Sequence, residues 1–211
     1  MPEPYGTVLI MGAWNYPVQL VLSPMVAAIG AGNCVVLKPS ELAGKVSNLL
    51  ADLIPKYMDN EAIRVFEGGV EETTELLKQR FDHIMYTGSE MVGKIVMRAA
   101  SEYLTPVTLE LGGKSPCVVD DNTNLKVTAD RIVWAKFLNA GQTCIAPDYV
   151  LVTRQQRPAL VEALKTSLLK QYGNNVEKNE DYGRIINERH FDRIVSYLEG
   201  QQTNILHGGE T

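Results

Sequence analysis

The sequence predicts an α/β fold built around a parallel sheet, followed by the first part of a second α/β lobe. Short apolar runs alternate with longer amphipathic segments over the first two-thirds of the 211-residue chain, which is typical of consecutive strand–helix–strand units. The loops between these segments contain turn-forming pairs such as Gly32-Asn33 and Pro39-Ser40. Hydrophobic residues make up 45% of the chain and charged residues 21%, as in ordinary folded proteins.

The strands and helices of the first part follow from apolar runs and their punctuation. The predicted strands are Thr7–Met11, Cys34–Lys38, Ile63–Phe66, His83–Tyr86, Val107–Leu111 and Pro116–Val119. The predicted helices are Val18–Ile29 with a break at Ser23-Pro24, Gly44–Tyr57, Glu71–Gln79 and Ser89–Leu104.

The same pattern continues after Asp120. The predicted elements are a helix over Leu125–Asn139, a strand over Tyr149–Val152, helices over Pro158–Tyr172 and Glu188–Glu199, and a strand at Ile205-Leu206. The Gly112-Gly113 turn is the predicted boundary, which gives domains of residues 1–111 and 112–211. Since the chain stops directly after a strand-like segment, we expect it to be a fragment of a longer protein.

Charge and cysteine content exclude several classes of protein. Lys and Arg number 20 against 25 Asp and Glu, a net charge of −5 without a basic block, which argues against nucleic-acid binding. Three cysteines without a CxxC pair predict neither a disulfide framework nor a thiolate metal cluster, and favour a reducing, cytoplasmic compartment. The first apolar run, Thr7–Met11, is too short for a signal peptide or a membrane span.

Polar residues and glycines follow several predicted strands. Ligands of open parallel sheets bind at the carboxyl ends of the strands, so residues 12–15, 38–41, 87–93 and 110–113 are predicted to line one crevice. Lys38 and Glu41 would suit the hydroxyls of a ribose, although a solvated turn explains them equally well. Trp14 and Asn15 are either part of this crevice or a packed indole beside a turn residue.

The segment from Gly88 to Gly93 lies between a predicted strand and an amphipathic helix. Amides at such a helix N-terminus can receive a phosphate group. The two glycines do not form a GxGxxG motif, so a plain strand-to-helix turn remains the alternative.

Cys144 differs from the other two cysteines because it lies in a loop bounded by Gly and Pro. Cys34 and Cys117 lie in apolar runs and are expected to be buried. An accessible loop cysteine can be a nucleophile or can be structural, and both interpretations stay open at this point. The three histidines, His83, His190 and His207, are scattered, so neither a Cys–His pair nor a metal site is predicted.

Five motifs in this order resemble the aldehyde dehydrogenase superfamily, and its class 3 branch of fatty and aromatic aldehyde dehydrogenases most closely. They are GAWNYP (12–17), KPSE (38–41), YTGSEMVG (86–93), TLELGGKSP (108–116) and NAGQTCIAPDY (139–149). The resemblance covers essentially the whole chain, and ELGGKSP followed by GQTC is its most specific part.

The resemblance implies oxidation of an aldehyde to a carboxylic acid through a thiohemiacetal and a thioester. Cys144 would be the nucleophile, and the Asn15 side-chain amide and the Cys144 backbone N–H would hold the oxyanion. Glu110 would activate the water that hydrolyses the thioester, which requires that its carboxylate be partly desolvated.

The resemblance also implies a Rossmann-like sheet that binds NAD or NADP. Residues 1–111 would be part of the NAD(P)-binding domain, and residues 112–211 the N-terminal part of the catalytic domain. The cofactor-binding residues would be Lys38 and Glu41 at the adenosine ribose, Gly88, Ser89 and Gly93 at the pyrophosphate, and Trp14.

Members of the family are longer than this chain, and the complete protein is expected to be a homodimer acting on a small aldehyde. Any membrane anchor of the class 3 type would lie beyond this chain. One alternative is a non-catalytic nucleotide-binding fragment or pseudoenzyme. A second, an acylating enzyme that transfers the thioester to coenzyme A, is disfavoured by Glu110, because a hydrolytic base favours water as acceptor.

Overall fold

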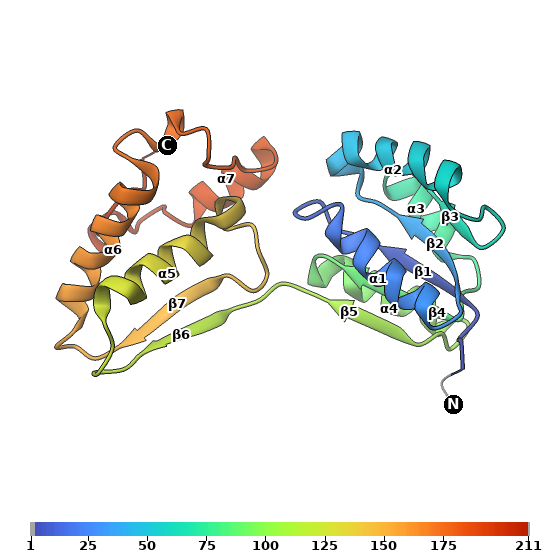
Figure 1. Ribbon diagram of the computed structural model, residues 1–211, viewed down its shortest axis with the longest axis horizontal. Helices are drawn as coiled ribbons and strands as arrows, with labels where there is room; N and C mark the ends of the chain where they lie inside the picture. The colour runs from blue at the N-terminus through green and yellow to red at the C-terminus, as the bar shows by residue number, and fades with distance from the viewer. Residues whose placement is uncertain (1–2, 211) are drawn as a thin grey trace. The chain divides into compact units, whose positions relative to one another are not determined.

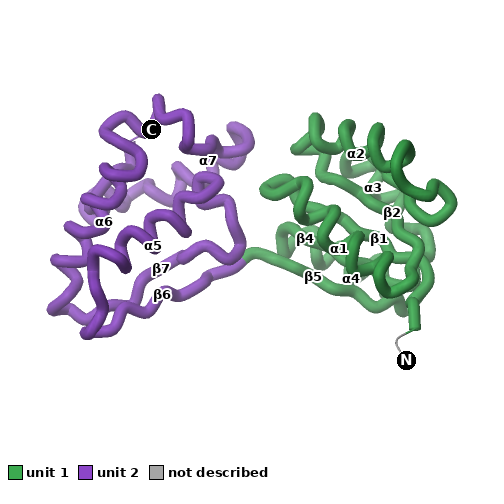
Figure 2. Tube along the Cα trace, viewed as in Figure 1, with its two compact units in different colours: residues 1–112 green, residues 113–211 purple. Residues whose placement is uncertain are grey.

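The computed structural model describes residues 3–210, and the chain divides after Gly112 into two compact units (Figures 1 and 2). Unit 1 is residues 1–112 and unit 2 is residues 113–211. Each has its own sheet, five-stranded in unit 1 and two-stranded in unit 2. The predicted α/β class with parallel strands is confirmed in both units.

Unit 1 alternates strands and helices along the chain. Its elements are β1 (Thr7–Met11), α1 (Gln19–Gly30), β2 (Cys34–Lys38), a 3₁₀ turn (Glu41–Ala43), α2 (Gly44–Tyr57), β3 (Ile63–Val65), α3 (Val70–Leu77), β4 (His83–Thr87), α4 (Glu90–Ser101) and β5 (Val107–Glu110).

The strand order β3-β2-β1-β4-β5 reverses direction at β1. The chain moves outward from β1 to β3 on one side and then returns to the other side of β1 through α3 and β4. Met11 pairs with Lys38 on one neighbour and with Tyr86 on the other, so these strands end level with one another. Ligands of open α/β sheets bind at such a reversal, outside the carboxyl ends of the strands.

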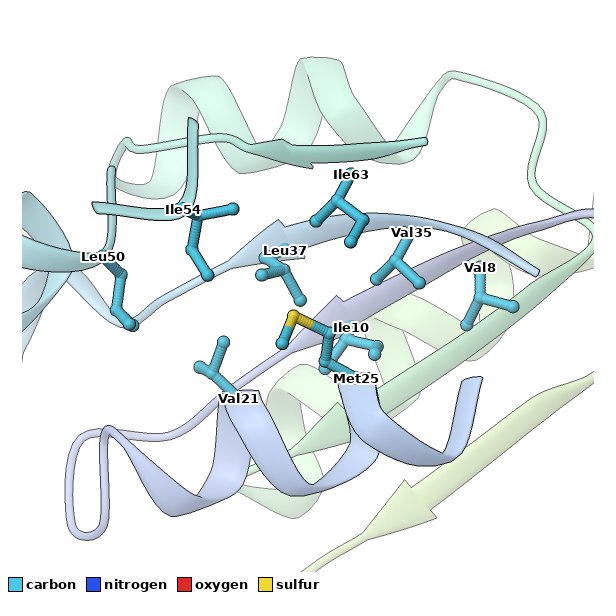
Figure 3. Close-up of a cluster of buried hydrophobic side chains, with 9 residues drawn as sticks. All are labelled: Val8, Ile10, Val21, Met25, Val35, Leu37, Leu50, Ile54 and Ile63. Atoms are coloured by element: carbon cyan, nitrogen blue, oxygen red, sulfur yellow. The ribbon is translucent and has the colours of Figure 1, made fainter. Parts of the chain in front are cut away.

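Helices cover both faces of the sheet of unit 1. Successive strand residues point to opposite sides, and since residues on both sides are apolar, both faces must be buried. One core, drawn in Figure 3, packs α1 and α2 on the sheet and consists of Val8, Ile10, Val21, Met25, Val35, Leu37, Leu50, Ile54 and Ile63. The other packs α3 and α4 on the opposite face and consists of Leu9, Met11, Leu76, Leu77, Phe81, Ile84, Tyr86, Val96 and Ala100. The alternation within β1 therefore assigns its residues to both cores in turn.

Helix α1 runs through Pro24 without interruption, so the predicted break at Ser23-Pro24 is wrong. A proline inside a helix removes one hydrogen bond and costs about 3 kcal/mol. Val21 and Met25, on either side of Pro24, are both buried against the sheet. We attribute the continuity of the helix to this packing.

Unit 2 places helices beside a short parallel sheet. Its elements are β6 (Ser115–Val119), α5 (Leu125–Phe137), a 3₁₀ turn (Leu138–Gly141), β7 (Pro147–Val152), α6 (Arg157–Tyr172), a 3₁₀ turn (Val176–Lys178), α7 (Glu188–Ser196) and a 3₁₀ turn (Gln202–Asn204). Strands β6 and β7 pair in parallel, with Val118 opposite Leu151. Helices α5 and α6 pack against each other, and Asp130 joins them by accepting hydrogen bonds from Ser167 and Lys170.

Three expectations from the sequence are wrong. Ile205 and Leu206 form no strand; the chain turns at Gly208 and Gly209, both with positive φ, and Gly209 lies against the Ile205 side chain. Cys34 is exposed because it is the first residue of β2, ahead of the part of the strand that contributes Val35 to the core. Cys117 is only half-buried, since it lies in the two-stranded sheet of unit 2.

Candidate active site

The candidate residues of unit 1 lie at the carboxyl ends of its strands. Trp14 and Asn15 are half-buried in the loop that follows β1, and Lys38 is the last residue of β2. Gly88 follows β4, and Glu110 ends β5, where it is paired with Thr87 of β4. The parallel register therefore brings the predicted residues of unit 1 to the same edge of the sheet.

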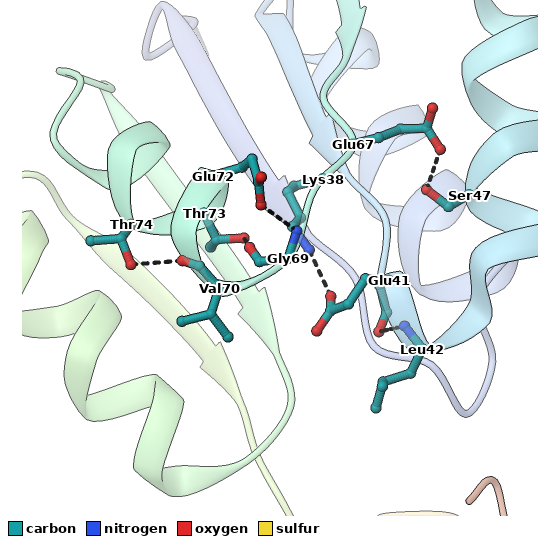
Figure 4. A network of polar contacts seen from close by, with 11 residues as sticks. Lys38, Glu41, Leu42, Ser47, Glu67, Gly69, Val70, Glu72, Thr73 and Thr74 are labelled. Atoms are coloured by element: carbon teal, nitrogen blue, oxygen red, sulfur yellow. Dashed lines mark hydrogen bonds and ion pairs between the residues drawn. The ribbon is translucent and has the colours of Figure 1, made fainter.

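Lys38 and Glu41 form an ion pair at this edge (Figure 4). The Lys38 Nζ atom lies 2.9 Å from Glu41 Oε2, and Lys38 is buried while the Glu41 carboxylate is half-exposed. Burial by itself raises the pKa of Glu41, but the hydrogen bond from Lys38, a hydrogen bond from the Glu41 backbone N–H and the positive charge of Lys38 together outweigh it, and the pKa is lowered. Glu41 is therefore ionised at neutral pH, with one oxygen already engaged.

Glu72 is a polar residue of this region that the sequence reasoning missed. Its carboxylate accepts a hydrogen bond from Gly69 N at 2.8 Å and caps the start of α3 (Figure 4). Hydrogen bonds from the backbone N–H groups of Glu72 and Gly69 lower its pKa, and the charge of Lys38 adds a smaller effect. A Glu three residues after a Gly at a helix start was the available signal.

The turn from β4 into α4 is built around two close approaches. Ser89 caps α4 by accepting a hydrogen bond from Val92 N at 3.3 Å. A Cβ atom on Gly88 would lie 2.1 Å from the Tyr86 hydroxyl oxygen, so this position requires glycine. Gly93 is buried within α4, where a Cβ would lie 3.0 Å from the Leu111 side chain, so it allows the helix to pack closely on its neighbour.

Tyr86 is a second residue that the sequence reasoning did not single out. Its side chain is buried in the core beneath Gly88, and burial raises its pKa despite hydrogen bonding at Ser89. The phenol is therefore neutral at physiological pH, and it packs against the backbone of the turn at Gly88.

Glu110 is exposed, contrary to the expectation that its carboxylate is partly desolvated. Residues of β5 alternate between exposed and half-buried, and Glu110 falls on the exposed side. Leu109, its half-buried neighbour, packs against the second core instead.

Cys144 lies in unit 2, in the loop between α5 and β7, and its thiol is free and exposed. The loop begins with a left-handed turn in which Asn139 and Ala140 have φ of 53° and Gly141 has φ of 76°. A left-handed conformation is unfavourable for alanine, so contacts elsewhere must hold this turn.

The segment that enters unit 2 passes directly beside the Cys144 backbone. A Cβ atom on Gly113 would lie 2.0 Å from the carbonyl oxygen of Cys144. Next to it, Lys114 forms an ion pair with Asp148 at 3.2 Å, and Lys136 lies 3.9 Å from the same carboxylate. Glycine at position 113 thus allows the two segments to touch through their backbones.

Among residues 3–210, no group of three or more His, Cys, Asp or Glu side chains is placed to hold a metal ion. None of the helices described is long and apolar enough to span a bilayer.

Comparison with known proteins identifies the family. The sequence model of the aldehyde dehydrogenase family matches residues 1–211. The chain is 58% identical to a rat protein named "Aldehyde dehydrogenase, dimeric NADP-preferring", over 98% of the chain and 45% of the rat protein. It is 57% identical to rat "Aldehyde dehydrogenase family 3 member A2", over 100% of the chain and 43% of that protein.

Solved structures agree with this assignment. An AldH structure from Staphylococcus aureus, described as a substrate-bound state, superimposes with a TM-score of 0.94 at 51% identity, over 99% of this chain and 46% of that one. A Mycobacterium tuberculosis aldehyde dehydrogenase complexed with NAD+ superimposes with a TM-score of 0.88 at 28% identity, over 99% and 44%. The chain spans less than half the length of these relatives. It belongs to the aldehyde dehydrogenase family.

Proposed function

We propose that this protein oxidises an aldehyde to a carboxylic acid with NAD or NADP, through a thioester on Cys144. The observation that carries the proposal is a free, exposed Cys144 within the GQTC motif of a chain that belongs to the aldehyde dehydrogenase family. Unit 1 would be the nucleotide-binding part and unit 2 the first part of the catalytic domain.

The residues of unit 1 fit a dinucleotide. Gly88 allows the turn into α4 to lie against the Tyr86 ring, and the first amides of this helix can receive a pyrophosphate. Lys38 and Glu41 present a donor and an ionised acceptor for ribose hydroxyls at the end of β2. We assign three further residues to the same site. Ser89 caps α4, Gly93 allows α4 to pack closely on its neighbour, and Trp14 would line the site.

An ionised Glu41 would repel a phosphate on the ribose and so favour NAD, whereas Lys38 beside it would attract one. One relative is named NADP-preferring and another was solved with NAD+, so the proposal includes both cofactors.

The chemistry of this chain's own residues follows from their types. The Cys144 thiolate would attack the aldehyde carbon, and the oxyanion formed would accept hydrogen bonds from the Asn15 amide and the Cys144 N–H. A bound nicotinamide would supply the acceptor for the hydride. Loss of this hydride from the thiohemiacetal carbon would leave a thioester on Cys144. Glu110 would take a proton from water, which attacks the thioester, breaks the C–S bond and releases the carboxylic acid.

Partner and compartment are proposed on separate grounds. A homodimer is supported by the rat relative whose name includes "dimeric". A cytoplasmic location is supported by three cysteines that are all free.

A non-catalytic nucleotide-binding protein is the second candidate. It is favoured by the exposure of Glu110, whose carboxylate lacks the desolvation that a strong base needs.

Reduced-nicotinamide formation with a medium-chain aldehyde, measured for the wild type and for Cys144→Ser, tests the proposal. We expect turnover by the wild type alone, with unchanged cofactor binding by calorimetry in the variant. Turnover that survives in Cys144→Ser would refute the nucleophile assignment. Cofactor binding without turnover in either protein would support the second candidate.

A further inference from the structure

Gln142 connects the Cys144 loop to a segment far along the chain. Its Nε2 atom donates to the carbonyl oxygen of Asn139 at 3.0 Å and to that of Arg184 at 3.1 Å. Its Oε1 atom accepts from Ile186 N at 3.0 Å. One half-buried amide side chain therefore binds the left-handed turn at one end and residues 184–186 at the other.

The left-handed turn needs such support. Asn139 and Ala140 are both left-handed without being glycine, and conformations of this kind persist only where surrounding contacts determine them. The Asn139 carbonyl accepts hydrogen bonds from both the backbone N and the side chain of Gln142. Gly183 packs beside this turn, since a Cβ there would lie 3.5 Å from Ala140 N.

The segment that Gln142 binds is itself anchored to the helices of unit 2. Tyr182 lies against the rings of Phe137 and Tyr172, at centroid distances of 6.3 and 5.3 Å. The Arg184 guanidinium donates to the carbonyl oxygens of Glu177 and Tyr182. Residues 184–186 therefore offer Gln142 a fixed pair of backbone groups.

We infer that Gln142 is a positioning residue that holds the Cys144 loop in its left-handed path against residues 184–186. The hydrogen bonds of Gln142 to Asn139, Arg184 and Ile186 all involve backbone atoms of those residues, so position 142 requires both a donor and an acceptor. The functional meaning of this inference rests on the proposed role of Cys144, but the contacts themselves do not.

Amide hydrogen exchange of the 211-residue chain, resolved by peptide, tests the inference. In Gln142→Ala we expect faster exchange at 139–146 and at 184–186 together, by roughly tenfold or more, because each lost hydrogen bond accounts for up to about a factor of ten. The matched control is Gln171→Ala, which removes Nε2 hydrogen bonds to Asp130 O and Ser167 Oγ in the same unit. Unchanged exchange at 139–146 in Gln142→Ala would overturn the inference.

Gln142→Glu provides a readout that general loss of structure does not produce. The carboxylate keeps an acceptor for Ile186 N but places negative oxygen against two carbonyl oxygens. We expect fast exchange of the loop at neutral pH and recovered protection in acid, where the protonated carboxyl can donate again, after correction for intrinsic exchange rates. Wild-type protection at neutral pH would overturn the inference. The proposed function fails separately, if Cys144→Ser retains turnover.

Discussion

The two units stabilise their candidate residues by different means. In unit 1 the sheet is covered on both faces, so each strand end projects from a framework with two buried cores. In unit 2 the cross-strand neighbours Val118 and Leu151 are 72% and 52% exposed, and one face of the short sheet remains open. Lys38 is therefore placed by strand geometry, whereas Cys144 is placed by local hydrogen bonds and by a glycine contact.

The contrast shows that one candidate site can combine residues positioned by a packed sheet with a residue positioned by local contacts of its loop. Loops commonly carry reactive residues, and the Cys144 loop is held by the hydrogen bonds of Gln142 and by the close approach of Gly113. Substitutions in the sheet of unit 1 should therefore affect global stability, and substitutions beside the Cys144 loop should act locally.

The largest effect is expected from a core substitution in unit 1. Leu9 is fully buried in the central strand β1, so Leu9→Ala should destabilise unit 1 by about 2–5 kcal/mol. Urea unfolding followed by Trp14 fluorescence, in a Trp134→Phe background, reports on unit 1 alone. The control, Leu151→Ala, is followed by Trp134 fluorescence in a Trp14→Phe background, and it should cost unit 2 less than about 0.5 kcal/mol, because Leu151 is 52% exposed.

The outcome for Leu151 decides whether the contrast between the units holds in solution. Equal losses of unfolding free energy in Leu9→Ala and Leu151→Ala would mean that the open face of the unit 2 sheet is covered in solution.

An intermediate effect is expected from Gly113→Ala. The added methyl group would lie 2.0 Å from the Cys144 carbonyl oxygen, so one backbone must move, at about 1–3 kcal/mol. Gly112→Ala is the matched control, since no atom lies within 4 Å of its Cβ position. The measurement is the alkylation rate of each free cysteine, mapped by peptide. In Gly113→Ala the rate should change at Cys144 and stay constant at Cys34, and in Gly112→Ala both rates should stay constant. An unchanged Cys144 rate in Gly113→Ala would contradict the contact.

The smallest effect is expected at Asp130, where a hydrogen bond from Ser167 and the nearby Lys170 lower the pKa. A carboxyl with a lowered pKa contributes stability above its unfolded pKa and loses it as the pH falls through the folded value. The α5–α6 contact should therefore weaken below about pH 4. Acid unfolding followed by Trp134 fluorescence measures this loss, which Asp130→Asn should reduce.

The matched control for Asp130 is Asp52→Asn, which removes an exposed ion pair with Lys56 in unit 1. It should leave the acid unfolding of unit 2 unchanged. An identical acid transition in the wild type and in Asp130→Asn would rule out this contribution.

The sequence alone determined the parallel sheet, its strands and the positions of the polar residues at the strand ends. These features depend on alternation within short runs and on turn residues, both of which are local. Thr7–Met11, Cys34–Lys38 and Gly44–Tyr57 agree with the structure residue for residue. Two families of motifs, at the strand ends and around Cys144, were sufficient to indicate the aldehyde dehydrogenase family.

Only the tertiary structure decided which of these residues are buried and what they contact. Pro24 lies inside a continuous helix because the core holds the residues around it. Glu110 is exposed although its neighbours are apolar, and Gln142 binds backbone groups 42 and 44 positions away. Burial and hydrogen-bond partners depend on segments that are distant along the chain, so no local pattern of residues predicts them.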